Sequence, residues 1–309
     1  MKKLLLTAAL AGAMLSSCSQ KPTEAETETT PTAAASAEEG YVESINQWHA
    51  ERVKNLQKED GWLALAGLYW LEPGSNSFGS AAGNDVAFPA GKIAPQAGAF
   101  ILEGNEVKLQ PAKGADITLN GEPVLQEVRV YSPEMEQPAQ MRHGSLKWVV
   151  IQRGDKYGVR LWDAENEARK NFAGIERYPV QPEWKLEAVL EQNPLPKQVA
   201  ITNVLGQTSQ EPSPGAVVFT KEGQQYRLDA LEEGDELFII FADKTNGTDT
   251  YGSGRYLYIP KPGPDGKTYI DFNKAYTPPC GFTGYATCPL PPKQNFLPIA
   301  VTAGEKSEH

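Results

Sequence analysis

Arginines, aspartates and tyrosines in the second half of the sequence are the side chains whose types and positions are best suited to chemistry. They are Arg160, Asp243, Tyr251, Arg255, Asp271 and Tyr276, with Asn273 beside the last two. An arginine can hold a carboxylate or a phosphate with two parallel hydrogen bonds, and an aspartate in a cleft can act as a general base. These residue types predict a cleft that binds an anion, with Asp243, Asp271 and Tyr276 as the catalytic candidates.

Ligand binding in that cleft is assigned to a second set of side chains. This set comprises Arg160, Tyr251, Arg255 and Asn273. A structural role for the same groups is the alternative. The two arginines would then form bidentate ion pairs with Asp243 and Asp271, and the tyrosines would cap backbone groups. The sequence leaves both alternatives open.

The position of Arg160 in its predicted strand bears on this choice. Successive side chains of a strand point to opposite faces, so Arg160 shares a face with Trp162 and lies opposite Val159 and Leu161. Arg160 therefore need not lie in an apolar core, and it can face a ligand.

Motifs of the common catalytic and cofactor-binding sites are missing from the sequence. It has three histidines, His49, His143 and His309, and no G-x-S-x-G, H-E-x-x-H, P-loop or dinucleotide-binding pattern. We expect no bound metal and no cofactor. Whether the protein is an enzyme stays open.

The N-terminus has the pattern of a secretion signal. Lys2 and Lys3 precede an apolar stretch over residues 4–14, and Leu15-Ser16-Ser17-Cys18 follows it. This tetrapeptide resembles a bacterial lipobox, so we expect residues 1–17 to be a signal peptide and Cys18 to carry the lipid (palmitate). The apolar stretch is too short to span a bilayer, which makes that lipid the predicted anchor in the cell envelope. The leaflet and the side of the membrane stay open.

Residues 18–40 predict a disordered acidic tether. From residue 19 on, this segment has no aromatic residue and no Val, Ile or Leu, so it cannot bury enough apolar surface to offset the entropy lost on ordering. The whole chain has a formal net charge of −10. An acidic body binds nucleic acid poorly, because that affinity comes mostly from neutralising phosphates. The expected partners are the membrane, through Cys18, and a small anionic ligand or another envelope component.

The elements that position these residues are predicted to be mainly β. Apolar residues at helical spacing from Val42 to Leu56 predict one N-terminal amphipathic helix over residues 41–60, which Gly61 ends. Short apolar runs divided by Gly, Pro, Asn and Asp then recur about every ten residues. The predicted strands are 63–71, 124–131, 145–152, 157–162, 184–191, 198–204, 216–220, 226–230, 237–242, 255–259 and 268–272. We expect the last two to form a hairpin across Pro264-Asp265-Gly266.

This pattern is typical of antiparallel sandwiches and barrels. We predict a β-sandwich over residues 61–175 and a second β-rich half over residues 176–309, which the proline- and cysteine-containing segment closes. Cys280 and Cys288 are predicted to form a disulfide that closes a nine-residue loop, worth about 2–3 kcal/mol. Free thiols are the first alternative to this disulfide. A metal site is the second, although structural metals normally have four closely spaced ligands.

Part of the first half resembles forkhead-associated domains, which are β-sandwiches that bind phosphothreonine peptides. The resemblance covers residues 68–130, through Phe78-Gly79-Ser80, Asn84-Asp85 and Asn120-Gly121. That family has an arginine directly after the glycine, where this chain has Ser80. The resemblance therefore implies a similar fold and not the binding of phosphopeptides.

A second resemblance covers nearly the whole body, from Trp48 to Lys306. Its blocks are R-G-D-K-Y-G-V-R-L-W-D (153–163), F-A-D-K-T (241–245), Y-G-S-G-R-Y (251–256) and D-F-N-K-A-Y (271–276). Here the chain resembles bacterial lipoproteins of a family known as a domain of unknown function, DUF1684. The resemblance transfers no activity, because the family has none assigned.

Two functions follow as hypotheses. The first is an envelope lipoprotein that serves as a non-catalytic binding or structural module for a small ligand, a glycan or a protein partner. The alternative is a hydrolase-like enzyme that uses Asp, Arg and Tyr side chains in a cleft of the C-terminal half. The first rests on the missing catalytic motifs and the sandwich-like pattern.

Overall fold

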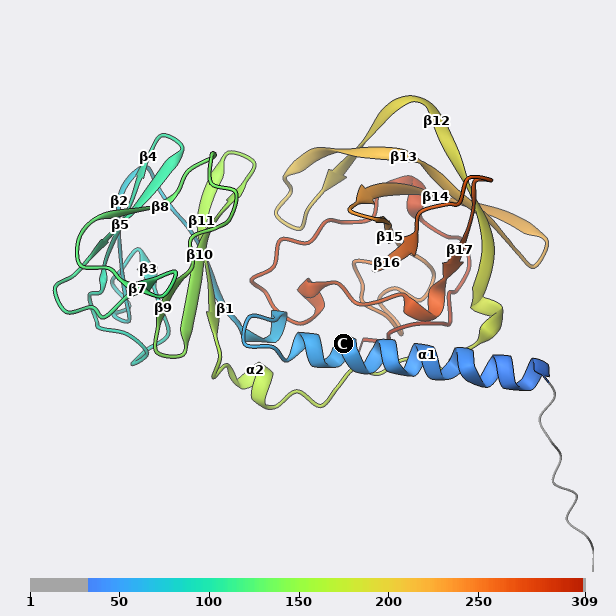
Figure 1. The fold of residues 1–309 in the computed structure, drawn as a ribbon, viewed down its shortest axis with the longest axis horizontal. Coiled ribbons are helices and arrows are strands. Elements are labelled where there is room, and N and C mark those ends of the chain that lie inside the picture. Colours follow the sequence, from blue (N-terminus) through green and yellow to red (C-terminus); the bar gives the residue numbers. More distant parts are fainter. Residues whose placement is uncertain (1–32, 308–309) are drawn as a thin grey trace, which may run out of the picture.

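The structure, a computed structural model, describes residues 33–307 (Figure 1). The predicted signal peptide, Cys18 and most of the predicted tether lie outside the described residues. The described chain is mainly β with antiparallel sheets, which confirms the predicted fold class. Strands β1 to β11 form the N-terminal half and β12 to β17 the C-terminal half, with helix α1 running along the base of the latter.

Two sheets make up the N-terminal half. The first has the order β1 (Leu65–Trp70), β11 (Lys156–Asp163), β10 (Leu146–Arg153), β9 (Met141–His143), β6 (Thr118–Leu119) and β7 (Glu122–Pro123). The second has the order β3 (Val86–Ala87), β2 (Gly74–Gly79), β4 (Gly98–Glu103), β5 (Glu106–Pro111) and β8 (Val128–Tyr131). The two sheets enclose one core, in which Phe78, Phe100 and Trp148 are completely buried. This arrangement is a β-sandwich.

One sheet forms the C-terminal half. Its order is β16 (Arg255–Pro260), β15 (Glu236–Phe241), β14 (Gln224–Glu233), β13 (Thr208–Lys221), β12 (Lys185–Thr202) and β17 (Lys267–Asp271). The first and last strands of this order also contact each other, so the sheet curls around an apolar core. Phe241, Leu257 and Phe272 are among the buried residues of that core.

Two predicted strand arrangements in this half are wrong. The hairpin expected across Pro264-Asp265-Gly266 does not form, because β17 pairs with β12 and β16 pairs with β15. Prolines at positions 260, 262 and 264 lack the N–H groups that such a hairpin would need. The predicted strands 184–191 and 198–204 are one strand, β12, whose register is irregular between Gln192 and Lys197.

Helix α1 (Ala33–Leu56) begins earlier and ends earlier than the predicted helix over 41–60. Residues 33–40, assigned to the tether in the sequence analysis, are helical, because alanine and glutamate favour helix there and only Gly40 opposes it. Ile45 and Leu56 bury the apolar stripe of α1 against the body. Short helices complete the described chain: α2 (Glu167–Lys170) and the 3-10 helices η1 (Trp62–Ala64), η2 (Pro182–Trp184), η3 (Phe272–Lys274), η4 (Pro279–Gly281) and η5 (Lys293–Asn295).

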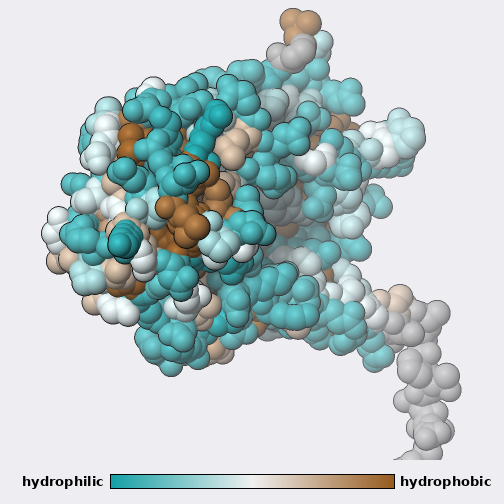
Figure 2. Space-filling model, turned by 60° about the vertical axis from the view of Figure 1, so that its left-hand side comes forward, coloured by the Kyte–Doolittle hydropathy of each residue, from teal (hydrophilic) through white to brown (hydrophobic). Residues whose placement is uncertain are grey.

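On the face shown in Figure 2 the surface is mostly hydrophilic, with one larger hydrophobic patch and several smaller ones. Among the described residues, no helix has the length and apolar character needed to cross a membrane.

Candidate functional site

A cavity of about 660 Å³ lies between the two halves of the molecule, a size typical of sites for small molecules. Three parts of the chain line it. Helix α1 and η1 contribute Trp48, Arg52, Leu56 and Trp62; the sandwich contributes Arg153 and Arg160; and the C-terminal half contributes Glu233, Phe238, Tyr256, Tyr258, Tyr276 and the segment around the cysteines. The site therefore depends on how the two halves and the helix pack together.

Helical spacing explains the contribution of α1. Trp48, Arg52 and Leu56 are four residues apart, so their side chains follow one another along one face of the helix. The Trp48 side chain is half-buried and lines the cavity.

The aromatic wall of the cavity comes from strands β15 and β16. In β15, Leu237, Ile239 and Phe241 face the core of the C-terminal half, while Phe238 and Ile240 face outward. Tyr256 and Tyr258 of β16 lie on the same outer face. The Phe238 and Tyr258 rings stack with their centroids 4.9 Å apart. One face of these strands therefore packs against the core, and the other face forms the wall of the cavity.

Tyr276 extends this wall, and its ring stacks on that of Tyr258 at 6.2 Å between centroids. One tyrosine hydroxyl of the wall has a partner in the protein: Tyr256 donates to the Pro289 carbonyl at 2.6 Å. Burial raises the pKa of all three hydroxyls, so they stay protonated at neutral pH.

Arg160 is a buried cation of the cavity without a counter-charge in the described part of the chain. Its side chain belongs to β11, in the middle of a sheet and between Leu68 and Val149, yet it points away from the sandwich core. Arg160 is only 8% exposed. Among residues 33–307, no carboxylate forms an ion pair with it, and its buried Nε has no hydrogen-bond partner. Burial, followed by the nearby charge of Arg153, lowers the pKa of Arg160 to about 10.

The other two arginines of the cavity have partners. Arg52 forms an ion pair with the buried Glu305, donates to the Thr277 carbonyl at 2.8 Å, and lies over the Tyr276 ring at 4.4 Å. Arg153 is exposed at the rim and donates to the Thr287 hydroxyl at 3.2 Å. The guanidinium of Arg160 lies over the ring of Trp62, whose centroid is 5.8 Å from the guanidinium carbon.

The segment around the cysteines closes one side of the cavity. Cys280 and Cys288 form a disulfide with their Cα atoms 6.1 Å apart. Pro279, Phe282, Ala286, Thr287, Cys288 and Pro289 line the cavity from this segment. The disulfide thus fixes a wall of the candidate site.

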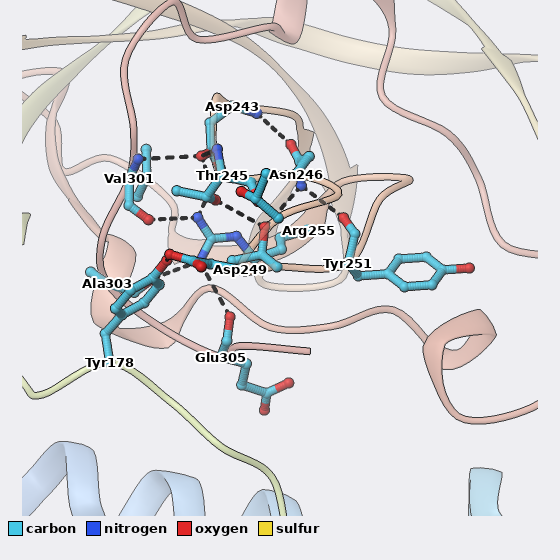
Figure 3. A network of polar contacts seen from close by, with 12 residues as sticks. Tyr178, Asp243, Thr245, Asn246, Asp249, Tyr251, Arg255, Val301, Ala303 and Glu305 are labelled. Atoms are coloured by element: carbon cyan, nitrogen blue, oxygen red, sulfur yellow. Dashed lines mark hydrogen bonds and ion pairs between the residues drawn. The ribbon is translucent and has the colours of Figure 1, made fainter. Parts of the chain in front are cut away.

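The structure places Arg255 and Asp243 elsewhere, in a solvent-excluded network of the C-terminal half (Figure 3). Arg255 Nη2 donates to the Asp243 carboxylate and to the Val301 carbonyl, each at 2.8 Å, and Nη1 donates to the Ala303 carbonyl at 2.6 Å. Asp243 also accepts from the amide and hydroxyl of Thr245. Through Val301 and Ala303, this pair holds the C-terminal segment over the core, and neither Arg255 nor Asp243 lines the cavity.

Tyr251 belongs to the edge of the same network. Its carbonyl accepts from the Asn246 amide at 2.8 Å, whereas its ring points away from the ion pair (Figure 3). Tyr251 and Arg255, both predicted to bind a ligand, therefore lie close to each other but away from the cavity that Arg160 lines.

Asp271 and Asn273 form a third cluster, which holds helix α1. Tyr41 of α1 donates its hydroxyl to the Asp271 carboxylate, at 2.8 and 2.9 Å to the two oxygens. The Asn273 amide donates to the Tyr41 hydroxyl at 3.0 Å and to the Gln181 carbonyl at 2.8 Å. Burial, then the charge of Asp271, raises the pKa of Tyr41. This cluster is a docking point for the helix.

Only Arg160 and Tyr276 of the predicted set thus share the cavity. Sequence reasoning missed Trp62, Phe238, Tyr256 and Tyr258 as lining residues. A signal was present in the unbroken apolar run of β15, since a strand with one solvent-exposed face would alternate apolar and polar residues. Within residues 33–307, no group of three or more His, Cys, Asp or Glu side chains is placed to hold a metal ion.

Comparison with known proteins adds a family but no activity. Residues 170–306 match the family described as "Protein of unknown function (DUF1684)", which supports the resemblance for the C-terminal half. No curated protein matches the chain. Among solved structures, the solution NMR structure of an uncharacterized protein from Haloarcula marismortui is 31% identical, with 46% of this chain and 81% of that chain covered and a TM-score of 0.38.

Proposed function

We propose that this protein, whose C-terminal half is similar to the DUF1684 family, is an envelope lipoprotein that binds a small anionic ligand without converting it. The ligand occupies the cavity between the two halves, and Arg160 neutralises its charge. The lipid on Cys18 holds the protein at the membrane, with the acidic segment that follows as a spacer.

The observation that carries this proposal is the unpaired charge of Arg160. A buried cation without a counter-charge costs free energy, because it has lost its water and gained no partner. The contact with Trp62 offsets this cost only in part. A carboxylate or phosphate in the cavity would complete the hydrogen bonding of the guanidinium, which gives this costly position a purpose.

Binding is favoured over catalysis by the positions of the catalytic candidates. Asp243 and Asp271 are committed to Arg255 and Tyr41, and neither lines the cavity. Tyr276 lines it, but burial raises the pKa of its hydroxyl rather than lowering it, which opposes a role as a base. None of these three residues therefore supplies a general base within reach of a ligand at Arg160.

The test combines a ligand screen with the variant Arg160→Met, followed by thermal unfolding. Small carboxylates, phosphates and sulfates should include a compound that raises the melting temperature of the natural protein, as any ligand specific to the folded state does. Arg160→Met should lose this rise. Without ligand, the variant should be as stable as the natural protein or more so, because an unpaired buried charge has been removed.

Arg129→Met is the matched control, since Arg129 is an exposed arginine of the same sandwich, paired with Glu106. It should keep the ligand-induced rise. Two results would contradict the proposal: a clear loss of stability in ligand-free Arg160→Met, which indicates a structural role, or a ligand-induced rise that survives in that variant.

A further inference from the structure

Charges and hydrogen bonds around the cavity restrict the ligand further, if the proposed function holds. We infer that the ligand is an amphipathic monocarboxylate, with its carboxylate on Arg160 and an apolar body against the aromatic wall. The inference rests on three features of the lining: its charge balance, the state of its polar groups, and its apolar surface.

Charge balance limits the ligand to one buried negative charge. The lining contains three arginines and two glutamates: Arg52, Arg153, Arg160, Glu51 and Glu233. Arg52 is neutralised by Glu305, and Arg153 is exposed to solvent at the rim, where water screens its charge. Arg160 alone offers a desolvated, unpaired positive charge. A second negative charge on the ligand would be buried without compensation, which disfavours a phosphate dianion.

The tyrosines of the wall offer few free hydrogen bonds. The Tyr256 hydroxyl donates to the Pro289 carbonyl at 2.6 Å, and Tyr258 and Tyr276 stack their rings on each other, so the wall presents mainly aromatic surface to a ligand. A sugar needs a partner for each of its many hydroxyls, because every unpaired polar group costs free energy when it is buried. This wall is poorly suited to a glycan.

Apolar surface dominates the remainder of the lining. The cavity is lined by Leu56, Trp48, Trp62, Phe238, Phe282 and the tyrosine rings. Burying an apolar body there gains roughly 25 cal/mol for each Å² removed from water. A planar guanidinium binds a carboxylate with two parallel hydrogen bonds. Both ends of an amphipathic monocarboxylate therefore have a complementary surface.

The experiment uses dodecanoate below its micelle concentration, titrated into the natural protein by calorimetry. Fluorescence of the cavity tryptophans, Trp48 and Trp62, gives a second readout. Dodecanol is the uncharged control, acetate the control without an apolar body, and dodecyl phosphate the dianionic control. We expect one dodecanoate to bind per chain. Dodecanol and acetate should each bind at least about tenfold more weakly, because a hydrogen bond to a charged group contributes at least that factor to the affinity.

Variants locate the binding site. Arg160→Gln should weaken the affinity for dodecanoate by about tenfold or more and leave the affinity for dodecanol unchanged. Arg129→Gln should change neither affinity. Trp62→Leu should weaken both ligands, because it removes part of the apolar wall.

Each other outcome overturns the inference. Equal binding of dodecanol and dodecanoate, or binding that is indifferent to Arg160→Gln, excludes a carboxylate at Arg160. Two outcomes overturn the monocarboxylate but keep the proposed function. In the first, dodecyl phosphate binds more tightly than dodecanoate and its binding depends on Arg160. In the second, dodecanoate does not bind, and a fully polar anion from the screen binds in a manner that depends on Arg160. If no anion binds in a manner that depends on Arg160, both fail.

Discussion

Two buried arginines of this chain differ in their surroundings and therefore in their roles. Arg255, completely buried, has an ion pair with Asp243 and donates to the carbonyls of Val301 and Ala303. Arg160, almost as buried, has an aromatic ring and no ion pair within the described part of the chain. The Nε of each arginine lacks a hydrogen-bond partner, so the difference between them is the buried carboxylate, which compensates the charge of Arg255 and not that of Arg160. Residue type and burial alone would not separate them.

The structural role of Asp243 leads to a prediction at this scale. Asp243→Asn should lower the free energy of unfolding by about 3–5 kcal/mol, because the Arg255 charge stays buried without its partner. Urea unfolding at neutral pH measures this loss.

Glu191→Gln is its control, since Glu191 pairs with Arg227 on the surface, where an ion pair contributes at most about 1 kcal/mol. A stable Asp243→Asn variant with altered ligand binding would contradict the structural role and return Asp243 to the candidate site.

At the scale of elements, helix α1 both docks on the C-terminal half and lines the cavity. Tyr41 fixes its first part through Asp271 and Asn273, and Arg52 fixes its last part through Glu305. Between these two points lies Trp48, which lines the cavity. The position of the helix, and with it the shape of the site, therefore depends on hydrogen bonds to residues more than 200 positions away.

The Tyr41 hydroxyl makes this docking sensitive to high pH. Its pKa is raised in the folded protein, and an unfolded tyrosine has a pKa of about 10. The protonated hydroxyl therefore stabilises the fold fully below pH 10, and this contribution is lost as the pH rises through the folded pKa. Tyr41→Phe should cost about 1–3 kcal/mol at pH 8, because Asp271 loses a donor, and less above pH 10.

Urea unfolding of both proteins between pH 8 and 11 tests the effect of Tyr41. The difference between them isolates this residue from the other buried tyrosines. Tyr285→Phe, at an exposed tyrosine, should show a small difference from the natural protein at pH 8. A Tyr41→Phe difference that stays constant up to pH 11 would rule out the hydroxyl of Tyr41 as its origin.

At the scale of the whole molecule, the cavity exists because two β halves and one helix meet. The sandwich supplies the cation, the curled sheet supplies the aromatic wall, and α1 supplies the remaining side. A ligand held there contacts all three parts and should stabilise them together. The lipid proposed at Cys18 would keep this assembly at a membrane surface.

Membrane attachment is predicted to depend on Cys18 alone. Cys18→Ala should move the protein from the detergent-rich phase to the aqueous phase in a phase-separation assay, because a thioether-linked lipid is the proposed anchor. Cys280→Ser should stay in the detergent-rich phase, as the natural protein does. Retention of Cys18→Ala in the detergent-rich phase, or absence of the lipid mass from the N-terminal peptide of the natural protein, would refute the lipoprotein proposal.

Local sequence patterns were sufficient to predict the class of fold and most of the strands, because periodic apolar patterns and turn residues act locally. They also placed Arg160 on the face of β11 opposite Val159 and Leu161, since strand alternation needs no tertiary information. They failed where distant pairing decides the result. The prolines that follow β16 direct β17 to β12, a strand some 80 residues earlier, and no local pattern indicates that choice.

The grouping of the polar residues depends on packing between distant segments of the chain, which local patterns do not contain. The predicted set of arginines, aspartates and tyrosines divides into the Arg255 network, the Tyr41 docking cluster and the cavity of Arg160. An ion pair depends on distances of a few ångströms between segments far apart in the chain, and residue type carries no such distance. The sequence thus supplied the chemical groups, and the packing of two halves and a helix determined which of them was left without a partner.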